Sequence, residues 1–163
     1  LDMNSLMAAM SPEPARRSLV LVDQVTDPHN LGAIIRVVAA SGAGGLVVTK
    51  DRTSPFSPVV VCASAGTVFG IPIAVVANLA YVMERLKKEK YWLYGLDAAE
   101  GNDYRKEKYA SPAAFIIGSE GSGMRELTRK NVDFFVKIPM RSGVESLNVS
   151  TALAVVLFRA IEA

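Results

Sequence analysis

One stretch near the C-terminus decides the fold: residues 136–150, which read VKIPMRSGVESLNVS. It begins with apolar residues typical of a short strand, reaches a strand-ending proline at Pro139, crosses a polar turn, and enters an apolar segment opened by Asn148 and Ser150. This order predicts a strand, a loop and the N-terminus of the last helix. Such an arrangement gathers backbone N–H groups and small hydroxyl or amide side chains, which suits a small polar ligand.

The composition is that of one globular domain with ordinary charge. Half of the 163 residues are hydrophobic, which is enough for a substantial core. The net charge of +2 is too small to identify a nucleic-acid partner, although a basic face stays open. The single cysteine, Cys62, excludes an internal disulfide. With the single histidine, His29, it leaves no Cys/His cluster for zinc, so no metal is expected.

The N-terminal part gives expectations about setting and boundaries. The sequence has no apolar run of membrane-spanning length and no signal pattern, so we expect a cytoplasmic protein. It begins at Leu1 rather than at a methionine, which indicates a fragment of a longer protein. Residues 1–15 are interpreted as a linker, as a remnant of a missing N-terminal domain, or as a cloning or proteolysis remnant. Residues 16–163 are expected to form the remaining domain.

Apolar strands alternate with helical segments along that domain. Strands are predicted at 18–22, 45–49, 71–76, 91–96, 113–117 and 134–138. Helices are predicted at 31–40, 58–70, 77–90, 124–131 and 151–161, and the polar residues 100–111 are predicted as a loop. The alternation predicts an α/β fold with a mainly parallel six-stranded sheet, helices on both faces, and a site at the carboxyl ends of the strands.

The first helix of this domain carries two candidate site residues. Asp27 before Pro28 is a helix-start signal, because the aspartate can cap the helix and the proline needs no N–H partner. Asn30 follows in the first turn, and Arg36 interrupts the apolar face. Since Gly32 lies one turn before Arg36, we expect the guanidinium to fold back over the glycine toward Asn30. The alternative is a solvated arginine and a capping asparagine.

A glycine-rich turn, GSEGSG at residues 118–123, follows the fifth predicted strand. Its G-x-x-G-x-G spacing differs from the G-x-G-x-x-G of a dinucleotide fingerprint, which also follows a first strand, so a nicotinamide dehydrogenase is disfavoured. Neither a P-loop motif nor a G-x-S-x-G nucleophile elbow occurs in the sequence. The glycines still allow a ligand to approach the backbone near Glu120. The alternative is an ordinary strand-to-helix turn.

Three clusters in a fixed order carry a resemblance to a known family. They are Asn30-x-Gly32-x-x-x-Arg36, Gly118-x-Glu120-x-x-Gly123, and Ile138-Pro139-Met140 followed by SLNVS at 146–150. In this combination the chain resembles the catalytic domain of SpoU/TrmH RNA ribose 2′-O-methyltransferases, within the SPOUT superfamily, over roughly residues 17–163. Residues 27–33, DPHNLGA, look most like the members that methylate a guanosine in large-subunit ribosomal RNA.

The resemblance implies a fold, a cofactor and partners. The family fold ends in a deep trefoil knot, a rare exception to unknotted topology, and S-adenosyl-L-methionine lies in the cleft that the knot forms. Members work as homodimers on RNA. By position, cofactor contacts are expected at Leu96, Asp97, Gly118, Ser119, Glu120, Gly121, Ile138, Met140, Ser146 and Leu147. The catalytic positions are expected at Asn30, Arg36, Glu120, Ser146 and Asn148.

The implied reaction transfers a methyl group to a ribose 2′-hydroxyl. Asn30, Ser146 and Asn148 are expected to hydrogen-bond around the ribose, and Glu120 to orient Arg36 or nearby amides. Family proposals make the arginine a general base. Because arginine stays protonated in proteins, phosphate binding or alkoxide stabilisation is the alternative.

Three points stay open in this interpretation. Relatives often have a glycine two residues after the methionine of Ile-Pro-Met, where this chain has Ser142 and then Gly143, so a reshaped turn is expected there. A tRNA ribose 2′-O-methyltransferase of the same fold is the alternative enzyme. A non-catalytic RNA-binding or ribosome-assembly protein is the alternative class, although the joint presence of the five catalytic candidates argues against it.

Overall fold

The structure is a computed structural model that describes residues 1–9 and 18–161. Residues 10–15 of the predicted linker therefore lie outside the described residues. Helices, strands and one 3₁₀ turn follow in the order α1 Met3–Ala9, β1 Leu19–Val22, α2 Pro28–Ser41, β2 Gly45–Thr49, α3 Pro58–Ala63, η2 Thr67–Phe69, β3 Ile73–Val76, α4 Leu79–Lys88, β4 Trp92–Leu96, β5 Asn102–Asp103, β6 Ala113–Ile117, α5 Glu126–Asn131, β7 Phe134–Lys137 and α6 Val149–Ile161.

The strands form one sheet in the order β3-β2-β1-β6-β4-β7-β5, and every neighbouring pair is parallel. The predicted α/β class and parallel sheet are confirmed. The predicted number of six strands is wrong, because β5 adds a seventh strand within the segment predicted as a loop. It has only two residues, Asn102 and Asp103, which pair with Val136 and Lys137 at the sheet edge. So short and polar a strand has no apolar pattern in the sequence.

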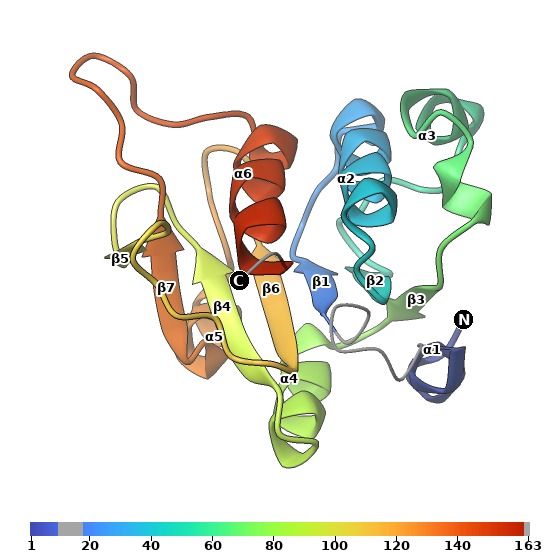
Figure 1. The fold of residues 1–163 in the computed structure, drawn as a ribbon. Helices are drawn as coiled ribbons and strands as arrows, with labels where there is room; N and C mark the ends of the chain where they lie inside the picture. The colour runs from blue at the N-terminus through green and yellow to red at the C-terminus, as the bar shows by residue number, and fades with distance from the viewer. Residues whose placement is uncertain (10–17, 162–163) are drawn as a thin grey trace.

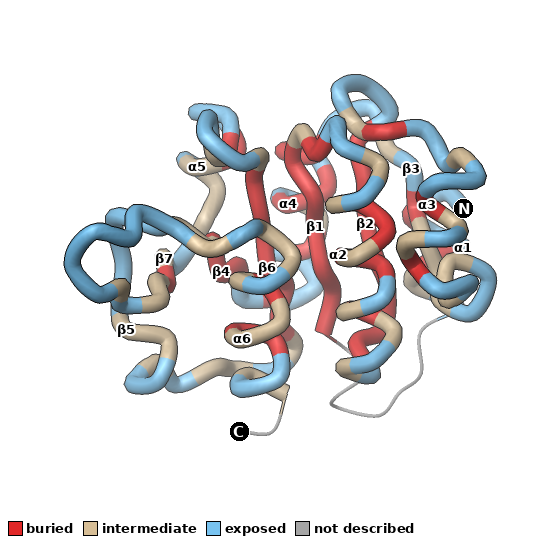
Figure 2. The backbone as a smooth tube through the Cα atoms, turned by 90° about the horizontal axis from the view of Figure 1, so that it is seen from above, coloured by how far each residue is buried: buried red, intermediate tan, exposed pale blue. Residues whose placement is uncertain are grey.

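The sheet separates two apolar cores. Alternate residues of β1 face opposite sides: Val20 and Val22 pack with α2 and α6, whereas Leu19 and Leu21 pack with α1 and α4. Both faces are buried, which is why these strands read as continuous apolar runs. Figure 1 shows α2 and α6 side by side on one face, and Figure 2 shows the buried central strands β1, β2 and β6. The expected helices on both faces are therefore present.

The predicted helix at 58–70 is wrong in extent. Helix α3 ends at Ala63, and the chain then turns through Ala65 and Gly66, whose φ angles of 51° and 78° are left-handed. The Gly66 N–H donates to the Val61 carbonyl at 3.0 Å, which closes the helix end. The 3₁₀ turn η2 follows. The small residues after Ala63 therefore end the helix, whereas Ala63 itself packs closely against Gly32 of α2.

The first residues of the chain pack onto the sheet. Helix α1 buries Met3 and Leu6, and Leu6 lies in the core on the α4 side. The Leu1 carbonyl accepts from the Val75 N–H at 3.1 Å, beside the edge strand β3. Residues 1–9 thus contribute to the fold, while their expected role as a linker stays a prediction. Among the described helices, none combines the length and apolar character needed to cross a membrane.

Candidate active site

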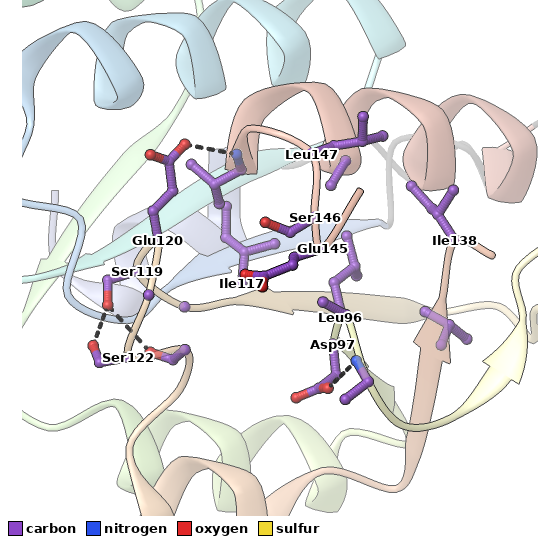
Figure 3. A pocket seen from close by; sticks show the side chains of 18 of the residues that line it. Leu96, Asp97, Ile117, Ser119, Glu120, Ser122, Ile138, Glu145, Ser146 and Leu147 are labelled. Carbon is purple, nitrogen blue, oxygen red and sulfur yellow. Dashed lines mark hydrogen bonds between the residues drawn. The ribbon is translucent and has the colours of Figure 1, made fainter. Parts of the chain in front are cut away.

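A cavity of about 410 Å³ opens at the carboxyl ends of β4, β6 and β7 (Figure 3). Three loops line it: the segment after β4, the glycine-rich turn after β6, and the long segment between β7 and α6. All ten residues predicted to contact the cofactor lie in its lining, namely Leu96, Asp97, Gly118, Ser119, Glu120, Gly121, Ile138, Met140, Ser146 and Leu147. The structure therefore brings together segments that are separated by up to about fifty residues in sequence.

The glycine-rich turn is closed by its own backbone. Ser119 and Gly123 exchange backbone hydrogen bonds of 3.1 and 3.0 Å, and the hydroxyls of Ser119 and Ser122 lie 2.5 Å apart. A Cβ atom at Gly118 would meet the Gly123 carbonyl carbon at 2.1 Å, so only glycine fits this position. Gly121 adopts a φ of 90°, which an L side chain rarely allows. Glycine at positions 118 and 121 thus lets the turn close on itself beside the cavity.

Three predicted catalytic residues meet at the edge of the cavity. The Asn148 amide nitrogen donates to Asn30 Oδ1 at 2.8 Å and to Glu120 Oε1 at 2.5 Å. A carboxylate only accepts hydrogen bonds, so the Asn148 atom facing Glu120 must be the amide nitrogen, and the Asn30 atom facing Asn148 must be its oxygen. Residues from the first, second and third motifs are therefore joined by direct contacts.

The start of α6 fixes the orientation of Asn148. Its Oδ1 accepts from the Ser150 N–H at 3.0 Å and from the Ser150 hydroxyl at 2.7 Å, which makes Asn148 the capping residue of the helix. Glu120 Oε1 also accepts from the Val149 N–H at 3.1 Å, which places a negative charge beside the positive end of the helix (Figure 3). Both Asn148 and Glu120 are thus held by the backbone that they cap.

The loop after β4 is organised around Asp97. Its Oδ1 accepts from the N–H groups of Ala99 and Glu100 at 2.8 and 3.1 Å, and its Oδ2 accepts from Arg129 Nη1 at 2.5 Å. Burial is the largest single influence on Asp97 and raises its pKa. The hydrogen bonds from Arg129, Ala99 and Glu100 together outweigh burial, so the pKa of Asp97 is lowered. Asp97 is therefore ionised and bound to protein groups on both oxygens.

The segment between β7 and α6 projects beyond the sheet (Figure 1). Ile138, Met140, Ser146 and Leu147 line the cavity from this segment. Its outer turn carries Gly143 with a φ of 88°, and the Val144 N–H donates to the Arg141 carbonyl at 3.2 Å. The turn at 141–143, for which a reshaped conformation is expected, is thus closed with the left-handed residue at Gly143.

The expected contact of Arg36 with Gly32 is wrong. A Cβ atom at Gly32 would meet Ala63 Cβ at 2.4 Å and the Val60 carbonyl at 2.9 Å, so the open side of this glycine receives α3. Arg36 is exposed on α2 and is not among the residues that line the cavity. The predicted cap, in contrast, is confirmed, because Asp27 Oδ1 accepts from the His29 N–H at 2.9 Å.

Sequence reasoning missed two charged residues of the lining, Arg129 and Glu145. Glu145 stands one position before the recognised Ser146, so proximity to the motif was the available signal. Arg129 lies in α5, 32 residues from its partner Asp97, and nothing in the sequence pairs them. Over residues 1–9 and 18–161, no three His, Cys, Asp or Glu side chains gather in a way that could hold a metal ion.

The fold and the site define a class of protein: a parallel α/β domain whose small-molecule cavity is built from loops at the carboxyl ends of its strands. Residues 17–158 match the SpoU rRNA Methylase family. The chain belongs to this family, and the resemblance carried by its three motifs is confirmed.

Two curated relatives indicate what the chain is similar to. It is 41% identical over 143 residues to the 23S rRNA (guanosine-2'-O-)-methyltransferase RlmB of Pseudomonas putida, covering 88% of this chain and 58% of that protein. It is 40% identical over 162 residues to RlmB of Ralstonia nicotianae, covering 99% of this chain and 64% of that protein. The chain thus spans less than two thirds of the length of either relative.

Solved structures agree on the fold. The SpoU methyltransferase AviRb of Streptomyces viridochromogenes, in complex with the cofactor AdoMet, superposes with a TM-score of 0.86 at 28% identity and covers 96% of this chain and 60% of its own. The AdoMet-bound rRNA methyltransferase of Sinorhizobium meliloti superposes with a TM-score of 0.80 at 32% identity, covering 92% of this chain and 60% of its own. Both structures therefore share the described domain.

Proposed function

We propose that the chain is the catalytic domain of an S-adenosyl-L-methionine-dependent RNA methyltransferase that modifies the ribose 2′-hydroxyl of a guanosine in large-subunit ribosomal RNA. The observation that carries this proposal is the contact series Asn30–Asn148–Glu120 beside the cavity, where residues of three separate motifs meet. Relatives named 23S rRNA (guanosine-2'-O-)-methyltransferase at 40 and 41% identity support the substrate.

The cavity fits S-adenosyl-L-methionine in size and in chemistry. Its volume of about 410 Å³ lies within the roughly 300–1,000 Å³ typical of small-molecule sites. Leu96, Ile138 and Leu147 offer an apolar surface suited to the purine, and the hydroxyls of Ser119 and Ser146 offer polar contacts. When bound, the cofactor supplies an electrophilic methyl group on a sulfonium. Carboxylates in the lining suit a ligand that carries this positive charge.

Asn30 and Asn148 have different roles in this proposal. Asn148 uses its amide nitrogen on Asn30 and Glu120, and its oxygen on Ser150, so it acts as a positioning residue. Asn30 accepts through Oδ1, which leaves its amide nitrogen to donate to a ribose oxygen. The Asn148–Glu120 contact thus determines which group of Asn30 faces the RNA.

Arg36 binds RNA rather than the cofactor in this proposal. The side chain is exposed on α2, outside the cavity lining. Because a guanidinium stays protonated, we assign it to a phosphate next to the target ribose and to stabilisation of the developing alkoxide. Ser146, which lines the cavity, is assigned to the side of the bound cofactor that faces the target ribose of the RNA.

A methyl-transfer assay tests the function. Tritiated S-adenosyl-L-methionine is incubated with large-subunit ribosomal RNA or with tRNA at low salt, because a chain of net charge +2 has little general affinity for phosphates. We expect label in the ribosomal RNA. We expect Arg36→Ala to abolish the label while calorimetry shows unchanged cofactor affinity. Label in tRNA alone would favour the tRNA enzyme, and cofactor binding without any transfer would favour a non-catalytic RNA-binding protein.

The remaining family features are proposed with their own tests. The C-terminal segment forms a trefoil knot. An experimental structure whose backbone trace is topologically unknotted would contradict this. The active form is a homodimer, which light scattering at the mass of one chain would contradict. The protein acts in the cytoplasm, where its RNA is made, and recovery from another cell fraction would contradict this. The domain division at residues 15 and 16 is tested by deleting the first fifteen residues and measuring stability.

A further inference from the structure

Arg129 occupies an unusual position between the cavity and the loop after β4. It lies in the last turn of α5 and lines the cavity. Its Nη1 donates to Asp97 Oδ2 at 2.5 Å, and its Nη2 donates to Glu100 Oε1. Its guanidinium also lies 4.8 Å from the centre of the Phe135 ring, on β7. One side chain thus contacts both ends of the 97–100 loop and the neighbouring strand.

The loop that Arg129 holds has few other contacts across to neighbouring elements. The Asp97 N–H donates to the Val136 carbonyl at 3.0 Å, and Lys137 Nζ donates to the Ala99 carbonyl at 3.3 Å. Ala98, Ala99 and Glu100 are exposed, and Ala98 and Ala99 line the cavity. The shape of this wall therefore depends on the Asp97 carboxylate, which Arg129 holds in place.

We propose that Arg129 is a positioning residue of the cofactor site, which holds residues 97–100 in the shape that binds S-adenosyl-L-methionine. The inference rests on the proposed function, because it concerns the same cofactor. It also assigns the Asp97 carboxylate to the protein, since both of its oxygens already accept hydrogen bonds there. The loop backbone, rather than this carboxylate, then faces the ligand.

A partly exposed ion pair contributes little to global stability, so its main effect is local. The Arg129 side chain is 32% exposed and that of Asp97 is 16% exposed. Solvent screens such a pair, so it adds little to the free energy of folding. If the loop is free to move in the unbound protein, the ligand must order it on binding, which weakens affinity.

Two ligands separate positioning from simple charge. S-adenosyl-L-methionine carries a positive sulfonium, whereas S-adenosyl-L-homocysteine has a neutral thioether at the same place. Removing a cation from the lining strengthens binding of the charged ligand if charge is all that matters, because Asp97 is then uncompensated. Loss of loop order weakens both ligands alike. The ratio of the two affinities therefore reports the mechanism.

The experiment measures both dissociation constants by calorimetry for the wild type, Arg129→Met, Arg129→Lys and Lys130→Met. Lys130 is the matched control, because it lies next in the same helix, pairs with Glu126 at 2.7 Å, and is absent from the cavity lining. We expect Arg129→Met to weaken both ligands about tenfold. We expect Arg129→Lys to lie between the wild type and Arg129→Met, since a lysine has no planar fork for two carboxylates. Lys130→Met is expected to bind as the wild type does.

Each outcome has a distinct meaning. Wild-type affinity in Arg129→Met, or a change confined to the charged ligand, would overturn the positioning role. Failure of the wild type to bind either ligand would instead contradict the proposed function. Urea unfolding of Arg129→Met checks the fold, and an equal loss of affinity in Lys130→Met would show that any change in α5 has this effect and would also overturn the inference.

Discussion

Two arginines four residues apart, Arg125 and Arg129, make the same kind of contact in two different environments. Arg125 binds Asp23, which directly follows β1, and Arg129 binds Asp97, which directly follows β4. In the sheet, β1 and β4 are the two neighbours of β6, whose own turn leads into α5. The short α5 segment therefore ties down the loops on both sides of the strand that precedes it.

The two pairs differ in burial and in what lies beside them. Asp23 is 0% exposed, although the Arg125 side chain is 40% exposed, and it accepts from both the Arg125 N–H, at 2.9 Å, and Arg125 Nε, at 2.7 Å. Asp97 keeps 16% of its side chain exposed, and its pair lines the cavity. The comparison indicates that the same ion-pair chemistry holds the protein together on one side of β6 and shapes a ligand wall on the other. Substitutions that separate stability from binding test this division.

The largest effect is expected from Arg125→Met. It leaves the carboxylate of Asp23 buried without its charged partner, although the backbone N–H of residue 125 still donates. Because Asp23 is buried but Arg125 itself is 40% exposed, we expect a loss of about 2 kcal/mol in the free energy of unfolding, typical of a hydrogen bond to a charged group. Urea denaturation measures it. The reference is Arg85→Met, which breaks the ion pair of 3.1 Å between Arg85 and Glu89 on α4, two side chains that are 32% and 37% exposed. A smaller loss from Arg125→Met than from Arg85→Met would contradict the structural role of Asp23.

A smaller stability effect is expected from Arg129→Met. The pair is partly exposed and solvent screens it, so we expect a loss of about 1 kcal/mol in the same urea experiment. In Arg129→Met the loss of cofactor-binding free energy should then exceed the loss of folding free energy. In Arg125→Met the loss of folding free energy should be the larger of the two. If both variants lost stability equally, the two sides of β6 would not differ in the way proposed.

The pH dependence sharpens the same contrast. The pKa of Asp97 is lowered in the folded protein, so its ionised form is favoured there relative to the unfolded chain. This stabilisation is present above the ordinary aspartate pKa of about 3.9 and is lost as pH falls through the lower folded value. The stability difference between wild type and Arg129→Met should therefore shrink on acidification below about pH 4. Urea unfolding across that range measures it, and a constant difference would contradict the assignment.

The smallest effect is expected from Lys130→Met. Its pair with Glu126 joins side chains that are 68% and 82% exposed, and solvent screens such charges almost fully. We expect its urea midpoint and its cofactor affinity to match those of the wild type. A clear loss of either would indicate that α5 tolerates no change, and the contrast between the two arginines would then lose its meaning.

The sequence predicted much of the fold and of the site for identifiable reasons. The central strands β1, β2 and β6 are buried throughout and carry continuous apolar runs, and the other three longer strands are also largely apolar, so the sequence predicts all six. The three motifs predicted Glu120, Asn148 and Asn30 as neighbours, and these residues do meet. In each case the signal lies within a few consecutive residues, either as a hydrophobic pattern or as a fixed spacing.

The parts that were missed depend on contacts between distant segments. Arg129 and Asp97 are 32 residues apart, and neither residue alone indicates the pair. Gly32 was assigned to Arg36, its neighbour in the helix, but the space beside it receives α3. Strand β5 exists only because β7 lies alongside it. Local spacing cannot predict which segment of the chain fills a space or completes a ladder.

The most direct test of the central claim is a crystal structure with bound S-adenosyl-L-methionine. We predict density for the cofactor in the cavity formed by the loops after β4, β6 and β7, with the backbone of residues 97–100 in contact and its methyl group toward Asn30. Cofactor density at another surface, or in this cavity with the 97–100 loop displaced from Arg129, would contradict the account.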